Sequence, residues 1–354
     1  KLVGIALVQS GSADHHTGVS AVNRPKRRSG APYEALTPET MLDAVDACGY
    51  RCDGRLLALS SYENRVYQFW LEDGSQIVAK FYRPGRWTDE AIAEEHGFAH
   101  ELAVREIPVV APLRIDGKTL FRHEGFRFAL YPKAPGRPPE FDDDDTLTWL
   151  GRFVARIHAV GALERFRHRP SLDIATYGRG AVDFILSGRF VPSDIIDAYR
   201  SVAEDVLERL ALRVDMVGPV RRIRLHGDCH AGNILSTEAG PHFVDLDDAC
   251  TGPAVQDIWM WLSGDRSAME SQLNAIVEGY RQFHAFDVTE LGLIEVLRTL
   301  RLMNYAAWLA RRWGDPAFPA NFPFFNTQRY WQDHILALRE QAAALEEPPL
   351  SVDY

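Results

Sequence analysis

The chain has few cysteines and no long apolar run. Four cysteines are spread over 354 residues, and no two of them have the Cys-x-x-Cys spacing of zinc knuckles or redox motifs. Sparse cysteines are typical of reduced thiols in a cytoplasm. No stretch reaches the roughly 18–20 apolar residues that are needed to span a bilayer. The sequence therefore predicts a cytoplasmic protein with no membrane partner.

The chain also lacks an excess of basic residues. Its 49 acidic and 39 basic side chains give a formal net charge of -10. Proteins that bind nucleic acid by neutralising phosphates usually carry a basic excess on one face, so no nucleic-acid partner is expected. The apolar share of 46% is typical of a globular protein, and the length allows one two-lobed domain. Residues 1–30 are mostly small or polar, which predicts a disordered leader rather than a secretory signal.

A pattern of helices and strands fills the first hundred residues after this leader. Thr37 precedes apolar residues at helical spacing, which predicts a short capped helix. Asp73–Gly74 and Asp116–Gly117 each separate two alternating segments, which predicts two antiparallel hairpins. Residues 87–107 lie between the hairpins and have a helical pattern. An antiparallel sheet with helices is therefore expected.

The densest cluster of Pro and Gly, KAPGRPP at residues 133–139, is where we expect the organisation to change. After it the pattern is mainly helical apart from residues 222–247, and it includes a helix predicted over 254–263. We therefore predict an α+β fold with two lobes. The N-lobe would span 31–132 with the small antiparallel sheet, 133–139 would be the hinge, and 140–354 would form the larger helical C-lobe.

Two short apolar strands in RRIRLHGDCHAGNIL and PHFVDLDDA are each accompanied by polar residues at what would be one edge of a hairpin. Asp228 and Asn233 are five residues apart, and Asp245 ends the second strand. Oxygen ligands of this kind suit Mg²⁺, which proteins bind through one or two carboxylates together with substrate phosphates. The remaining Asp could then orient a hydroxyl group.

This spacing, Asp-x-x-x-x-Asn followed by an Asp at a strand end, is the arrangement of protein kinases. That arrangement also needs a strand Lys near the ATP phosphates, and Lys80 ends the predicted strand IVAK. It needs a Glu on the next helix, where Glu95 lies on the inward face and Glu94 is the reserve choice. Asp228 and Asn233 alone could be turn caps. The ordered set favours phosphoryl transfer.

Two other kinds of site can be read from the same stretch. A metal hydrolase would use as ligands His226, Asp228, His230 and His242. That reading leaves Lys80 and Asn233 without a role. Cys229 could be a nucleophile with a neighbouring His as base, but adjacent residues on one loop rarely face each other. We expect Cys229 to be a small packed thiol and His226 to support the loop.

The motif HGDxHxxN, followed by a strand that ends in Asp, resembles the aminoglycoside phosphotransferase and choline kinase branch of the protein-kinase-like fold. Within it, SYENRVYQF, VAKFYRPGRWT, RLHGDCHAGNIL, FVDLDDACTGPAVQDIWM and RRWGDPAFPANFPF are similar to a family of bacterial stress-response serine/threonine protein kinases, from about Leu36 onward. The resemblance implies ATP between the lobes. It implies as catalytic residues Asp228 and Asp245, as Mg²⁺ ligands Asn233 and Asp245, and as ATP-binding residues Ser61, Lys80 and Glu95.

The chain departs from ordinary protein kinases at three places. SSYENR stands where the glycine-rich loop would be, so backbone amides and the hydroxyls of Ser60 and Ser61 would cover the phosphates. The triplet DLD replaces DFG, and no activation loop with an Ala-Pro-Glu end is visible. Asp257 is interpreted as a buried residue that ties down the backbone of the catalytic loop.

The expected function is transfer of phosphate from ATP, with Mg²⁺, to Ser or Thr of proteins, including autophosphorylation, in a stress response and by a monomer. The alternative is a small-molecule kinase for an aminoglycoside, choline or homoserine. A pseudokinase is disfavoured because every catalytic position is filled. The segment 302–324 could simply pack the core, or it could line the acceptor side, where Arg311 and Arg312 would repel a cationic acceptor.

Overall fold

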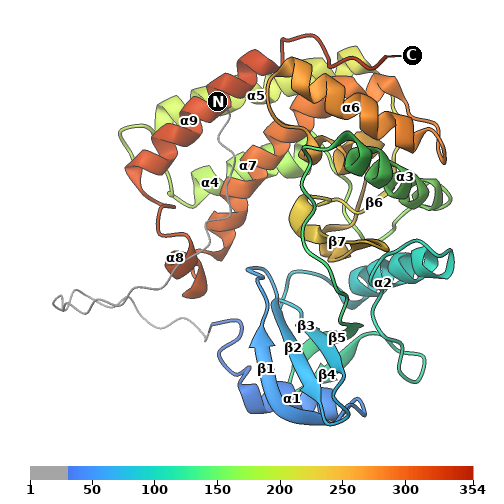
Figure 1. Cartoon of the computed structure of the whole chain (residues 1–354). Helices are drawn as coiled ribbons and strands as arrows, with labels where there is room; N and C mark the ends of the chain where they lie inside the picture. Colours follow the sequence, from blue (N-terminus) through green and yellow to red (C-terminus); the bar gives the residue numbers. More distant parts are fainter. Residues whose placement is uncertain (1–30, 354) are drawn as a thin grey trace. The chain divides into compact units, whose positions relative to one another are not determined.

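The structure is a computed structural model that describes residues 31–353, so the leader predicted for residues 1–30 lies outside the described part. Its largest sheet has five antiparallel strands in the order β1-β2-β3-β5-β4 (Figure 1). The strands are β1 (Cys52–Ala58), β2 (Arg65–Leu71), β3 (Gln76–Phe81), β4 (Phe121–His123) and β5 (Phe126–Pro132).

The first predicted hairpin is confirmed, and the second is displaced. β2 and β3 meet at Asp73–Gly74, where Gly74 has a φ of 82°. At the second site, Asp116–Gly117 forms only a local turn closed by one bridge, between Ile115 and Lys118. The β4–β5 hairpin turns instead at Glu124–Gly125. Pro112 lies inside the expected strand VVAPLRI at residues 109–115, and Pro cannot donate to a ladder, which explains why no long strand forms there.

Two helices pack against opposite faces of this sheet. Helix α1 (Pro38–Asp46), capped by Thr37 as predicted, packs against the face that carries Ala79 and Phe81. Side chains alternate along a strand, so Lys80 points to the other face. There Ile92 of α2 (Asp89–Val104) packs with Tyr82 at the end of β3. The C-terminal half of α2, with Phe98, Ala99 and Leu102, joins the large core of the helical part, so α2 contacts both parts of the fold.

The rest of the described chain is rich in helix, as predicted. Its helices are α3 (Asp144–Gly161), α4 (Gly180–Ser187), α5 (Ile196–Val217), α6 (Arg266–Tyr280), α7 (Ile294–Arg312), α8 (Ala317–Asn321) and α9 (Gln328–Ala344). Two small antiparallel pairs lie among them. They are β6 (Ile223–Leu225) with β9 (Cys250–Gly252), and β7 (Ile234–Thr237) with β8 (Gly240–Phe243). The predicted hairpin over the HGD motif region is thus β7–β8.

The helix predicted over 254–263 is wrong. The chain forms two short 3₁₀ segments there, Ala254–Asp257 and Trp259–Trp261. A regular helix does not form, and side chains of this stretch bond to the loop at residues 226–230. The indole of Trp261 donates to the carbonyl of Cys229 at 2.6 Å, and the amide of Gln256 donates to the carbonyl of Gly227 at 2.9 Å.

The Pro- and Gly-rich segment 133–139 pairs with the β7–β8 hairpin. Arg137 and Ser236 exchange backbone hydrogen bonds of 3.2 and 2.8 Å. Gly136 has a φ of 122°, and a Cβ atom at this position would lie 2.8 Å from the backbone of Leu235. Close approach of two backbones therefore requires glycine here. The interpretation of 133–139 as the boundary between two lobes stays a prediction.

No helix within residues 31–353 combines the length and the apolar character needed to cross a bilayer.

Gly136→Ala should destabilise the fold more than Gly117→Ala. Both glycines have positive φ, but Gly117 has open space around its Cβ position. The left-handed backbone costs roughly 1–2 kcal/mol in each variant, and the clash with Leu235 adds about 1 kcal/mol or more to the first. Urea unfolding of both variants and the wild type measures the difference. Equal losses of unfolding free energy would contradict the close approach of segment 133–139 to β7.

Candidate active site

The structure brings Asp228, Asn233 and Asp245 to one end of the β7–β8 hairpin. The side-chain amide of Asn233 donates to the carbonyl of Asp228 at 2.9 Å. The backbone carbonyl of Asn233 accepts from the N–H of Val244 at 3.0 Å, which places Asn233 next to the residue before Asp245. Asp245 has a left-handed backbone, with φ 58° and ψ 63°, and such non-glycine residues cluster at functional sites.

Asp257 holds the backbone of the loop that carries Asp228. Its carboxylate accepts from the N–H groups of His226 and Gly227, each at 2.8 Å, and it lies 3.1 Å from Nε2 of the buried His158. Gly227 has a φ of 86°, and a Cβ atom there would lie 2.1 Å from the carbonyl of Asp248. The predicted role of Asp257 is confirmed by these contacts.

Both ring nitrogens of His226 face backbone groups, one in the same loop and one after β8. Its Nε2–H donates to the carbonyl of Val244 at 2.9 Å, and Nδ1 faces the N–H of Asp228 at 3.4 Å. Cys229 is fully buried, and burial raises the pKa of its thiol well above the ordinary range. His226 therefore supports the loop, and Cys229 is a packed thiol rather than a nucleophile, as predicted.

Within residues 31–353 no three His, Cys, Asp or Glu side chains are arranged to hold a metal ion. The hydrolase set built on His226, His230 and His242 therefore does not come together. Asn233 and Asp245 supply an amide oxygen and one carboxylate, a donor set that fits Mg²⁺ bound jointly with phosphates. Asp245 is also well placed for an incoming ion, because 44% of its side chain is exposed.

The side chain of Lys80 extends from β3 to the residues that follow β8. Its ammonium group lies 2.6 Å from Oδ1 of Asp245 and 3.4 Å from Oδ1 of Asp247, and the residue is only 5% exposed. Burial alone would lower the pKa of Lys80, but the carboxylates of Asp245 and Asp247 raise it well above its ordinary value. Lys80 is therefore a buried cation beside the predicted metal ligand.

Glu95 faces inward as expected, but it is not bonded to Lys80 in this structure. The residue is 2% exposed, and its Oε2 has no hydrogen-bond partner among the described residues. Burial raises the pKa of Glu95 to about 7, while nearby Lys80 opposes the shift. Glu94, the reserve choice, has another task, because it accepts the backbone N–H groups of residues 167–169.

Asp228 is paired with a residue that the sequence did not point to. Arg301 of α7 places Nη1 2.5 Å from Oδ1 of Asp228, and Nε2 of His230 lies 3.5 Å from Oδ2. Nδ1 of His230 accepts the N–H of Gly232 at 2.9 Å, so in the neutral ring Nε2 carries the proton. Burial alone would raise the pKa of Asp228, but Arg301 and His230 hold it well below its usual range.

Asp247 was also missed, although it lies two residues after Asp245. It is 2% exposed, accepts from the side chain of Asn64 at 3.0 Å, and forms an ion pair with Arg86. Burial alone would raise the pKa of Asp247, but Arg86 and Lys80 hold it well below its usual range. The clustering of three acids in DLDD was the available signal, but it did not reveal which of them would be buried.

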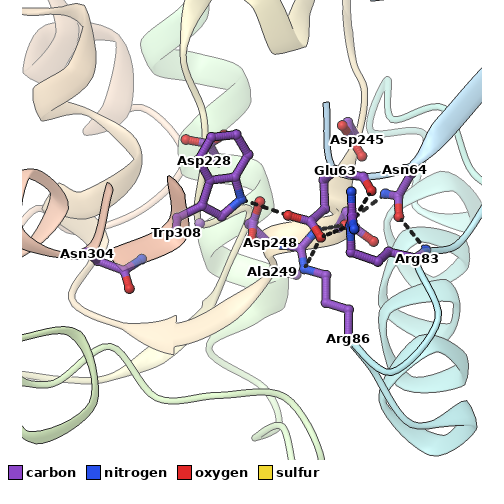
Figure 2. Close-up of polar contacts among 12 residues, drawn as sticks. Glu63, Asn64, Arg83, Arg86, Asp228, Asp245, Asp248, Ala249, Asn304 and Trp308 are labelled. Atoms are coloured by element: carbon purple, nitrogen blue, oxygen red, sulfur yellow. Dashed lines mark hydrogen bonds and ion pairs between the residues drawn. The ribbon is translucent and has the colours of Figure 1, made fainter. Parts of the chain in front are cut away.

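The loop between β1 and β2, at residues 59–64, carries Ser61 and is fixed from two sides. Glu63 accepts from the indole of Trp308 at 2.7 Å and forms ion pairs with Arg83 at 3.0 Å and Arg312 at 2.6 Å. Asn64 accepts the backbone N–H of Arg83 at 3.1 Å (Figure 2). Side-chain contacts thus fix a loop that has no glycine.

The segment 302–324 contributes to packing and also contacts the β1–β2 loop. Trp308 makes edge-to-face contacts with Phe318 and Phe322, and Trp313 makes one with Phe325, so the tryptophans contribute to packing. Arg312 and half-buried Trp308 both bind Glu63 of the β1–β2 loop, whereas the guanidinium of Arg311 lies over the ring of Phe184. The tryptophans therefore pack as the first reading expects, and the reading in which this segment lines the acceptor side stays a prediction.

Comparison with known proteins identifies the class. Residues 55–294 match the sequence model of a family described as the phosphotransferase enzyme family. The chain belongs to this family and is a kinase-type enzyme. It is 45% identical, over 92% of its length and 98% of the relative, to stress response kinase A of Escherichia coli strain K12. It is also 45% identical, over 90% and 97%, to a Salmonella typhimurium strain LT2 protein named serine/threonine protein kinase RdoA.

A solved structure confirms the fold. Amicoumacin kinase hAmiN, in complex with AMP-PNP, Ca²⁺ and Ami, has a TM-score of 0.68 against this chain, with 19% identity. The match covers 90% of this chain and 96% of the other. The predicted α+β, protein-kinase-like fold with a small antiparallel sheet and a helix-rich remainder is confirmed.

Replacing Glu95 by Gln should flatten the pH dependence of stability. The pKa of about 7 in the folded state exceeds the ordinary 4.5. The contribution of Glu95 to the unfolding free energy is therefore fully present below pH 4.5 and is lost as the pH rises through about 7. Urea unfolding at several pH values should show Glu95→Gln losing about 3 kcal/mol less than wild type across this window.

Buried Glu290 also has a pKa of about 7, and it accepts the N–H of Val255. Glu290 is present in the wild type and in Glu95→Gln, so the difference in pH dependence between these two proteins reports on Glu95 alone. The same loss of stability with pH in both proteins would show that Glu95 is not the buried acid inferred here.

Proposed function

We propose that this chain transfers the γ-phosphoryl group of ATP to Ser and Thr hydroxyls of proteins, including its own, with Mg²⁺ as the metal. The observation that carries the proposal is the convergence of Lys80, Asn233 and Asp245 beside Asp228, from segments up to 165 residues apart. This is the set that phosphoryl transfer from a metal-bound nucleotide requires.

In the proposed reaction Asp228 orients the acceptor hydroxyl and takes its proton. The hydroxyl oxygen forms a bond to the γ-phosphorus while the bond from that phosphorus to the bridging β,γ-oxygen breaks, and ADP leaves. Asn233 and Asp245 would hold Mg²⁺, which neutralises phosphate charge when bound. Lys80 would support the phosphates, Glu95 would support Lys80, and Ser61 would lie over them from the β1–β2 loop.

The choice of a protein acceptor has two supports. Relatives at 45% identity are named stress response kinase A and serine/threonine protein kinase, which also suggests a role in a stress response. In addition, the segment 302–324 has a single carboxylate, Asp315, which is 6% exposed and paired with Arg83. A cationic antibiotic or choline would need an acidic or aromatic cage without fixed positive charge, and the guanidinium of Arg301 beside Asp228 would repel it.

The second candidate is a small-molecule kinase. Its support is the fold shared with a protein named amicoumacin kinase. A cytoplasmic location and a monomeric state stay predictions.

Asp228→Asn should lower turnover at least about 100-fold and leave ATP affinity within a few-fold, because the amide cannot accept the hydroxyl proton. Asp287→Asn is a matched control, since Asp287 is an exposed cap whose carboxylate accepts the N–H of Thr289. Turnover is measured by phosphate incorporation, and ATP affinity by titration calorimetry. Turnover like that of the wild type in Asp228→Asn would refute the assignment of the base.

The acceptor class is tested by mass spectrometry of the purified chain and an added protein extract after incubation with Mg-ATP. Phosphoserine or phosphothreonine is expected on both. A coupled ADP-release assay with aminoglycosides, choline and homoserine should show no useful turnover. Rapid ADP release with one of these, and no phosphorylated protein, would replace the proposal by the small-molecule alternative.

A further inference from the structure

Arg301 differs from the other cations that pair with the carboxylates of the site. The side chains of Lys80, Arg86 and Arg312 are 6%, 12% and 13% exposed, and each contacts two carboxylates or a carboxylate and a ring. The side chain of Arg301 is 45% exposed. Among the described residues its guanidinium has one hydrogen bond, from Nη1 to Asp228. Arg301 is therefore the cation that can move at the smallest cost.

Helix α7, which carries Arg301, is held by two side-chain contacts that come from the same face of the helix. Arg301, Asn304, Tyr305 and Trp308 follow one another at three- and four-residue steps, so they share a face of α7. Arg301 contacts Asp228, and Trp308 contacts Glu63 of the β1–β2 loop. The backbone of Arg301 is thus held between the proposed base and the loop that would cover the phosphates.

Distances place the guanidinium near the transferring group. A hydroxyl bound to Asp228 lies about 3 Å from its carboxylate, and reacting atoms approach to about 3–3.5 Å. Since Nη1 is 2.5 Å from Oδ1 of Asp228, it lies within roughly 9 Å of the phosphorus before any movement. A long side chain with several remaining N–H donors can close this gap by rotation.

We propose that Arg301 is a catalytic residue of the phosphoryl transfer, which leaves Asp228 when nucleotide and acceptor bind and donates to an oxygen of the transferring γ-phosphoryl group. The proposal rests on the family activity and on the proposed role of Asp228, but not on the class of acceptor. Asp228 and the γ-phosphoryl group are both anionic and lie close together during transfer, so a mobile cation between them lowers their repulsion. An arginine in this position also stabilises charge on the phosphoryl oxygens of the transition state.

The test compares Arg301→Gln with Arg209→Gln. Arg209 lies on α5, and its guanidinium bonds to Asp205 of the same helix at 2.9 Å. Arg301→Gln should lower kcat on the order of 100-fold or more with the KM for ATP within a few-fold, whereas Arg209→Gln should keep the kcat of the wild type. Arg301→Lys should retain more activity than Arg301→Gln. Millimolar guanidine should partly restore the turnover of Arg301→Ala.

A second measurement does not depend on any acceptor. Affinity for ADP with Mg²⁺ and aluminium fluoride, a planar mimic of the transferring group, should fall at least tenfold in Arg301→Gln, while affinity for ADP with Mg²⁺ alone stays unchanged. Thermal unfolding shows whether each variant is folded.

Unchanged affinity for the aluminium fluoride complex would overturn the proposal and leave Arg301 as a residue that only orients Asp228. An equal loss of affinity for ADP alone would overturn it too. The acceptor class proposed above can fail in its own assay without altering either result.

Discussion

The site depends on the interactions of one buried carboxylate, that of Asp247. It takes an ion pair from Arg86, a hydrogen bond from Asn64 and the charge of Lys80 at 3.4 Å. These partners come from the β3–α2 connection, the β1–β2 loop and β3, whereas Asp247 follows β8. A buried carboxylate without such partners would be strongly unfavourable. The same charges that stabilise it therefore fix the sheet, the loop and the hairpin in one arrangement.

A second layer of contacts fixes the backbone around this carboxylate. Arg169 donates to the backbone carbonyls of Asp247 and Ala249, and its guanidinium lies 4.0 Å from the ring centroid of Trp87. Glu94 of α2 in turn binds the N–H groups of residues 167–169. Helix α2 thus fixes the backbone of Asp247 indirectly, because Glu94 holds the segment that carries Arg169. Because Glu94 and Glu95 are neighbours, one helix turn serves both the support of this backbone and the surroundings of Lys80.

The sequence predicted the residues whose position follows from local periodicity. Lys80 follows from alternation along β3, and Asp228, Asn233 and Asp245 follow from the β7–β8 hairpin. Arg301 and Glu63 could not be found in this way, because their partners are 73 and 245 residues distant and neither residue breaks a local pattern. The helix predicted over 254–263 failed for a related reason. Its apolar spacing was helical, but the polar groups of this stretch bond to a loop 29–32 residues earlier in the chain.

The departure of Lys80 from its expected partner fits the proposed chemistry. Lys80 bonds to Asp245 rather than to Glu95, whose pKa of about 7 leaves it partly protonated at neutral pH. Under the proposed function Asp245 would hold Mg²⁺, and its Oδ1 would then be less available to Lys80. Glu95 lies in the same buried space, and it can ionise to balance the ammonium group once that contact weakens. Glu95 would then replace Asp245 as the negative charge paired with Lys80. This exchange would keep Lys80 charged and buried beside the phosphates.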